Sequence, residues 1–201
     1  MTTHRIEALA DGIFAIAMTL MVLNLALPEG GKGLAELHSL LIGQLDKFFS
    51  YAVSFVILAV LWIRHHEQSH FIKRTDGRHL WINIIFLMFV GLVPFSTSLV
   101  GDYPDAPVAE VFFGFNIFVL GALLLCNWAY ATDHCRLVDP SLDRRRVTLD
   151  KRKGAIIPIV AVLAMGLSFI NPDMSSYAYL LIPAFQGVFR YRQRRMTGGT
   201  V

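Results

Sequence analysis

The stretch from His4 to Pro28, HRIEALADGIFAIAMTLMVLNLALP, decides the fold of this chain. Its charged residues, Arg5, Glu7 and Asp11, all come before an uncharged and mostly apolar run that ends at Pro28. A helix over 6–27 rises by about 1.5 Å per residue, which is enough to cross a hydrocarbon core of about 30 Å. The stretch therefore predicts a membrane-spanning helix.

Five more apolar segments follow along the chain, at about 45–63, 79–100, 108–130, 154–171 and 174–190. The last two are short, and Asn171-Pro172-Asp173 between them is a turn signal, which predicts a helical hairpin rather than one long span. The hydrophobic fraction of 55% exceeds that of ordinary soluble domains. We therefore expect an all-α membrane protein in which residues 1–201 form a single domain of six transmembrane helices.

Basic residues gather on one side of the predicted membrane. They lie before the first segment, between the second and third, between the fourth and fifth, and after the sixth, and only Lys32 and Lys47 fall on the other side. The connections on that other side carry acidic residues, Glu110 among them. The positive-inside rule then predicts a multi-pass protein of the cell membrane with both termini in the cytoplasm. The basic clusters fit contact with anionic lipid headgroups better than binding of nucleic acid.

The sequence His66-Glu67-Gln68-Ser69-His70 matches the H-E-x-x-H pattern with which many metalloproteases bind zinc on a helix. The second segment is expected to continue as a helix past the membrane face, which would place His66 and His70 on one side of it. A catalytic zinc also needs a third protein ligand, and the nearby candidates, Asp76 and His79, follow too closely. A membrane zinc protease is therefore the least favoured alternative, and we predict no metal site and no catalytic residues.

Ionisable side chains are absent from the middles of the six segments. Proton-coupled and ion-coupled carriers normally place such residues inside the membrane, often beside a discontinuous helix near the midplane. A small secondary transporter remains the main alternative function, although neither of its usual signs is present.

The first segment carries an apolar stripe in which Ile16, Leu20, Leu23 and Leu27 recur at helical spacing, with Thr19 beside it. On periodicity alone, such a stripe faces lipid or another helix.

A family resemblance gives the stripe another interpretation. The residues Arg5-x-x-x-Leu9-Ala10-Asp11-Gly12, with Ala15-Ile16-Ala17-Met18-Thr19-Leu20 after them, resemble the R-x-x-x-F-S-D signature and following helix of the transmembrane protein 175 family. This family comprises the endolysosomal potassium channel and its bacterial relatives. The similarity continues with Trp62-x-x-His65-His66, Asn83, Leu87 and Pro94-Phe95, although Leu9 and Ala10 replace the Phe and Ser of the signature.

The resemblance implies a homotetramer of six-helix subunits in which helix one lines a central pore. Ile16 would form the narrowest ring, Leu20 and Leu23 would form further apolar layers, and Thr19 would occupy the position linked to cation preference. Arg5 and Asp11 would form a gating network at the cytoplasmic face, with His65 and His66 packed beside it. The permeant ion would be K⁺, without any cofactor, and the partners would be the chain itself, the bilayer and monovalent cations.

The side chains at these positions imply a mechanism. A ring of isoleucines on an axis excludes water, and a dewetted constriction blocks ions without touching them. No run resembling the T-V-G-Y-G loop of potassium filters is present, so selectivity should be modest. We therefore expect a potassium-permeable cation channel without a P-loop filter, gated by a hydrophobic constriction of helix one.

Overall fold

The structure, a computed structural model, describes residues 3–25 and 34–187. Its elements are α1 (Thr3–Leu20), η1 (Met21–Leu25), α2 (Leu34–Ile42), α3 (Leu45–Phe71), α4 (Gly77–Asp102), α5 (Pro107–Thr132), η2 (Asp133–Cys135), α6 (Arg144–Ser168) and α7 (Pro172–Ala178), where η denotes a 3₁₀ helix. A further helical stretch covers 181–187. The all-α prediction is confirmed for this part of the chain.

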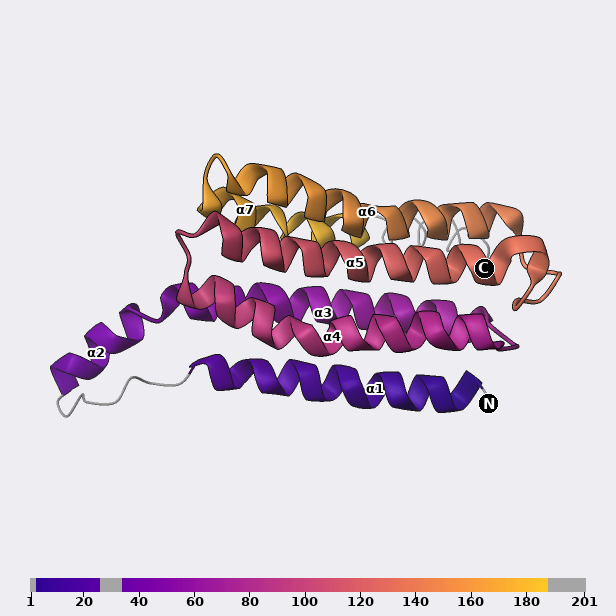
Figure 1. The fold of residues 1–201 in the computed structure, drawn as a ribbon, viewed down its shortest axis with the longest axis horizontal. Helices are drawn as coiled ribbons and strands as arrows, with labels where there is room; N and C mark the ends of the chain where they lie inside the picture. Colours follow the sequence, from indigo (N-terminus) through magenta and orange to yellow (C-terminus); the bar gives the residue numbers. More distant parts are fainter. Residues whose placement is uncertain (1–2, 26–33, 188–201) are drawn as a thin grey trace, which may run out of the picture.

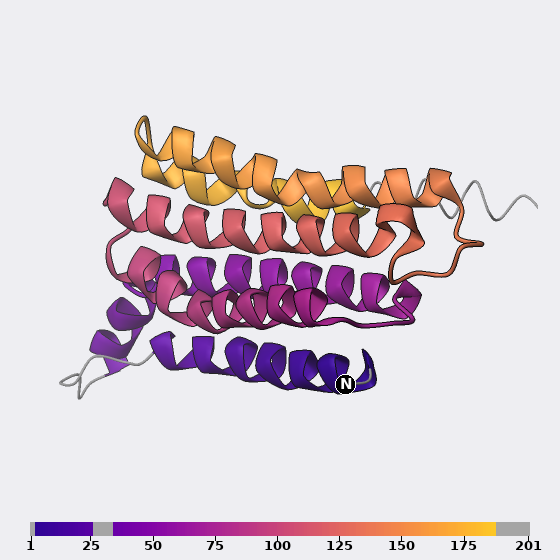
Figure 2. The same cartoon turned by 45° about the vertical axis from the view of Figure 1, so that its right-hand side comes forward.

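The long helices lie side by side as a layered bundle (Figures 1 and 2). α1 forms one edge of the bundle, α3 and α4 lie next to it, and α5, α6 and α7 form the opposite side. A continuous apolar core runs through these layers, from Phe14 and Met21 on the first helix to Ile117 and Leu120 on α5. α1 packs mainly against α3 and α4, and its other side is exposed among the residues that the structure describes.

Four helices are long and apolar enough to cross a membrane: Thr3–Leu25, Leu45–Phe71, Gly77–Asp102 and Pro107–Cys135. They match the first four predicted segments, and α3 continues past its predicted span to Phe71, as expected for the helix that carries the two histidines of the H-E-x-x-H sequence. The chain is therefore a multi-pass membrane protein by the length and composition of its helices.

The last two predicted segments form a helical hairpin, as expected, but with different bounds. α6 begins at Arg144, ten residues before the predicted apolar span, because Asp143 caps it by accepting from the backbone N–H of Arg145. α7 begins at Pro172, where proline suits the first turn of a helix. The chain turns at 179–180 before the helix at 181–187. Pro183 explains the turn, because it has no N–H to donate to the carbonyl of Tyr179. Residues 188–190 of the predicted sixth segment lie outside the described residues.

One helix was not predicted. α2 occupies the connection between the first two spans and projects from one end of the bundle (Figure 1). Leu37, Leu41 and Ile42 on this helix are exposed. Its nine residues are too few to give a periodicity that separates a helix from an apolar loop.

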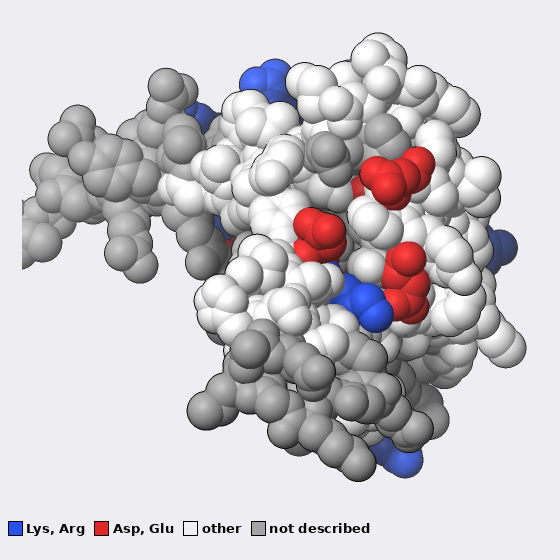
Figure 3. All heavy atoms as spheres, turned by 90° about the vertical axis from the view of Figure 1, so that its left-hand side faces the viewer, with Lys and Arg blue, Asp and Glu red and all other residues white. Residues whose placement is uncertain are grey.

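The two ends of the bundle differ. At the end opposite α2, the segments after α3 and after η2 pair: Ile72 forms a β-bridge with Val138, and the N–H groups of Lys73 and Arg74 donate to the carbonyl of Leu137. Figure 3 shows the other end, where acidic side chains gather beside a basic one. Lys47 and Asp102 form an ion pair of 2.6 Å, which ties the start of α3 to the end of α4 at this end.

Candidate functional site

The first helix has one buried and one exposed face. Ile6, Ala10, Phe14 and Ala17 recur at intervals of three or four residues and are buried against α3 and α4, and Met21 continues this face into η1. On the other face Ile16 is 58% exposed, Leu20 is 45% exposed and Leu23 is 67% exposed. The predicted apolar stripe is thus the uncovered side of α1 at the edge of the bundle, and Leu27 lies outside the described residues.

Thr19 lies on the same exposed side, between the levels of Ile16 and Leu20. Its hydroxyl Oγ1 is 3.0 Å from the carbonyl of Ala15 and 2.9 Å from the carbonyl of Ile16, and it donates its single hydrogen to this pair. The lone pairs of Oγ1 therefore point away from the helix backbone.

Asp11 is held from the neighbouring helix. The indole Nε1 of Trp62 on α3 donates to Asp11 Oδ1 at 2.8 Å. The Trp62 ring stacks on His66, with ring centroids 5.9 Å apart and an interplanar angle of 24°. The structure thus links Asp11 and His66 through Trp62, a residue for which no role was predicted. Arg5 is exposed, and within the described residues it forms no ion pair with Asp11.

His65, next to His66 on α3, is buried behind the first helix. It stacks on Phe86 of α4 with ring centroids 5.5 Å apart, and Phe14 of α1 lies 6.4 Å from it. His65 Nε2 is 2.9 Å from Asn83 Oδ1, and Asn83 Nδ2 donates to Asn127 Oδ1 on α5 at 3.3 Å. A chain of polar contacts therefore runs from His65 on α3 through Asn83 on α4 to Asn127 on α5.

The chain of polar contacts continues to the surface through His79, whose Nε2 is 3.2 Å from Asn83 Nδ2 and whose Nδ1 is 2.9 Å from Thr75 Oγ1. Asp76 caps α4 by accepting from the backbone N–H of His79, and the hydroxyl of Tyr130 on α5 also donates to it. These two hydrogen bonds hold the pKa of Asp76 below its usual range. Its carboxylate is therefore charged near neutral pH and keeps α4 and α5 together at this end.

Replacing Trp62 with Phe is expected to loosen the first turns of α1. The bond is solvent-exposed, so it contributes about 1 kcal/mol, and its loss should raise local opening by about fivefold. Hydrogen–deuterium exchange in peptides covering residues 3–12 should accelerate accordingly. Trp81 on α4 is 64% exposed, and Trp81→Phe is the matched control, which should leave this exchange unchanged. Equal exchange in Trp62→Phe and the original chain would remove the Asp11–Trp62 bond as an anchor.

The H-E-x-x-H residues do not form a metal site with other described residues. His66 and His70 lie one turn apart on α3 and are both exposed. Within the described residues, no three His, Cys, Asp or Glu side chains lie close enough together to hold a metal ion.

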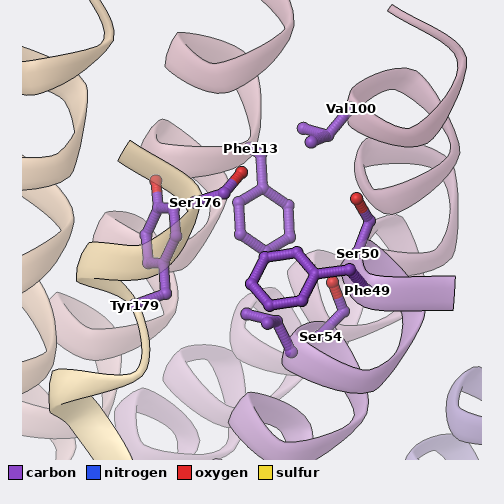
Figure 4. Close-up of a pocket in the computed structure, with 8 residues that line it drawn as sticks. Phe49, Ser50, Ser54, Val100, Phe113, Ser176 and Tyr179 are labelled. Carbon is purple, nitrogen blue, oxygen red and sulfur yellow. The ribbon is translucent and has the colours of Figure 1, made fainter. Parts of the chain in front are cut away.

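A pocket lies between α3, α4, α5 and the end of α7 (Figure 4). It is lined by Phe49, Ser50, Val53, Ser54, Val100, Phe113, Ser176 and Tyr179, none of which belongs to α1. Its volume of about 10 Å³ has room for about one water molecule. A hydrated cation does not fit this pocket.

Glu110 is a buried carboxylate that the sequence placed in an outer connection. It lies in the first turn of α5, is 1% exposed, and accepts hydrogen bonds from the hydroxyls of Ser175 and Ser176 on α7. These contacts join α5 to the C-terminal hairpin. The two serines are more than sixty positions away from Glu110 in the sequence, so the sequence alone did not predict this contact between α5 and α7.

Comparison with known proteins gives concordant matches. The family model for the endosomal/lysosomal potassium channel TMEM175 matches residues 5–94. A potassium channel of Chamaesiphon minutus is 33% identical over 180 residues, which cover 86% of this chain and 87% of that channel. A potassium channel of Streptomyces collinus is 27% identical over 187 residues, which cover 91% of this chain and 90% of that channel.

A solved structure matches the fold as a whole. The crystal structure of a lysosomal potassium-selective channel TMEM175 homolog from Chamaesiphon minutus has a TM-score of 0.80 to this chain at 29% sequence identity. The match covers 92% of this chain and 96% of that one, so it includes the C-terminal hairpin as well as the four long apolar helices.

Proposed function

The chain belongs to the TMEM175 family of potassium channels, and on that premise we propose that it is a potassium-permeable channel of the cell membrane. The family is one of channels rather than enzymes, so the zinc protease suggested by the H-E-x-x-H sequence is rejected. In this proposal residues 1–201 form one domain with six transmembrane helices, the C-terminal hairpin supplying the last two, and both termini lie in the cytoplasm.

The observation that best supports the proposal is the uncovered apolar side of α1. Four copies of the chain meet around a shared axis with this side facing inward, so that the ion pathway lies between protomers. Ile16 forms the narrowest ring, and Leu20 and Leu23 form apolar layers beyond it. The position of α1 at the edge of the bundle supports this arrangement, because no other part of the described protomer covers that side.

The mechanism follows from the chemistry of these side chains. Four isoleucines on the axis exclude water and so stop ions, and conduction requires them to leave the axis. The outward lone pairs of Thr19 then contact a partly dehydrated cation, which gives a modest preference for K⁺. Asp11, Trp62, His65 and His66 hold the inner end of α1 against α3 while it moves. Arg5 lies at the same end, and its charge acts on this network from solvent.

The purified chain in liposomes tests the proposal directly. With a K⁺ gradient and a protonophore to carry the compensating charge, we expect passive K⁺ flux well above that of empty liposomes, smaller Na⁺ flux, and no effect of a zinc chelator. Flux that requires a coupled Na⁺ or H⁺ gradient would instead support the secondary transporter. Absence of flux for all monovalent cations would reject both functions.

A further inference from the structure

The outer end of the first helix changes its geometry at Met21. α1 ends at Leu20, and the next five residues form the 3₁₀ helix η1. A 3₁₀ helix has three residues per turn, so residues three apart lie in line along its axis. Leu23 therefore follows Leu20 on the exposed side, and Asn24 is turned away from that side by about a third of a turn. Short 3₁₀ stretches are frequent at the ends of α-helices, where the last turn tightens.

Asn24 joins this 3₁₀ segment to α4. Its Nδ2 donates to the carbonyl oxygen of Pro94 at 3.1 Å, and the contact is partly buried. Pro94 lies inside α4, where proline bends a helix, and Figure 1 shows α4 bent rather than straight. A second, weaker contact lies beside it, where Thr97 Oγ1 donates to Met21 Sδ at 3.8 Å. Because an amide within a membrane must find its partner inside the protein, the bond between Asn24 and Pro94 resists separation of η1 from α4.

The first helix is thus held at both ends by different neighbours. Near its inner end Asp11 accepts from Trp62 on α3, and at its outer end Asn24 donates to Pro94 on α4. The exposed residues Ile16, Thr19 and Leu20 lie between these two attachments.

We propose that Asn24 is a positioning residue that holds η1 in its 3₁₀ form and so keeps Leu23 directed toward the pore axis. This inference rests on the proposed function, because it takes Leu23 to face the ion pathway. If the bond to Pro94 is lost, η1 can relax to α-helical geometry, in which each residue turns by about 100° instead of 120°. Over the three residues from Leu20 to Leu23 the difference is about 60°, which moves the Leu23 side chain off the axis.

Asn24→Leu tests the proposal, because leucine keeps the shape of asparagine and removes its N–H donor. We expect basal K⁺ flux in liposomes to rise by about fivefold, as the loss of one neutral hydrogen bond predicts. The reversal potential in mixed K⁺ and Na⁺ should stay unchanged, because Thr19 is untouched. Asn24→Gln keeps an amide donor and should return flux most of the way to that of the original chain.

Ser98→Ala is the matched control. Ser98 lies one turn beyond Pro94, and its hydroxyl donates to Asp102 Oδ2 within α4 rather than to η1. Flux in this variant should equal that of the original chain. If Asn24→Leu does not assemble like the original chain on gel filtration, the smaller change Asn24→Ala replaces it in the comparison with Asn24→Gln.

The outcomes separate the inference from the function on which it rests. If the original chain conducts and the Leu, Ala and Gln variants all show the same flux as the original chain, the role of Asn24 is overturned and the channel function stands. A changed reversal potential in Asn24→Leu also overturns it, because it would place Asn24 in ion selection. An original chain that does not conduct rejects the proposed function itself.

Discussion

Replacing Ile16 with Asn is expected to raise basal K⁺ flux through liposomes by about tenfold or more. Burying one isoleucine-sized side chain is worth about 1.5–3 kcal/mol, and four copies meet at the proposed constriction. A barrier lowered by only about 1.4 kcal/mol already gives a tenfold faster passage. The amide of asparagine also binds water, so the constriction would stay wet and the largest barrier to ions would be lost.

The matched control for this variant is Ile159→Asn on α6. Ile159 is 57% exposed, almost the same as the 58% of Ile16, but it lies on the far side of the bundle from α1. The proposal expects this control to leave K⁺ flux unchanged. Similar increases in both variants would mean that asparagine disturbs the bundle in general. Unchanged or lower flux in Ile16→Asn alone would remove Ile16 from the gate.

The sequence predicted the long helices well because their signal is local. A run of about twenty apolar residues determines a span whatever surrounds it, and the first four spans match α1 with η1, α3, α4 and α5. The predictions were less accurate where local signals were weak. α2 is too short to be recognised, and the break of the last helix at 179–180 depends on one proline, Pro183.

For the candidate site too, local features could be predicted from the sequence and long-range contacts could not. The spacing of Ile16, Leu20 and Leu23 was visible in the sequence as a stripe, but an apolar stripe alone does not distinguish a pore from a lipid contact. Trp62, the partner of α1, and Pro94, the partner of η1, lie 51 and 70 positions away from the residues that they contact. No periodicity within one helix predicts such pairs, so the attachments of α1 could be identified only from the packing of α3 and α4 against it.

Replacing Thr19 with Val is expected to lower the discrimination of K⁺ over Na⁺ by about fivefold, which corresponds to about 1 kcal/mol of lost interaction between oxygen and cation. Valine keeps the shape of threonine and removes only the hydroxyl. In the structure that hydroxyl donates its hydrogen to the carbonyls of Ala15 and Ile16, so only its lone pairs can contact an ion in the proposed pathway. The shift should be visible in the reversal potential under mixed salts, while total flux changes less.

Thr19→Ser separates the hydroxyl from the methyl group of the side chain. Serine can make the same bond back to the helix, so the reversal potential should stay near that of the original chain. If both variants keep the original reversal potential, Thr19 does not contact the ion. If both lose discrimination equally, the methyl group sets the width of the pathway, and selectivity would come from packing around Thr19 rather than from its oxygen.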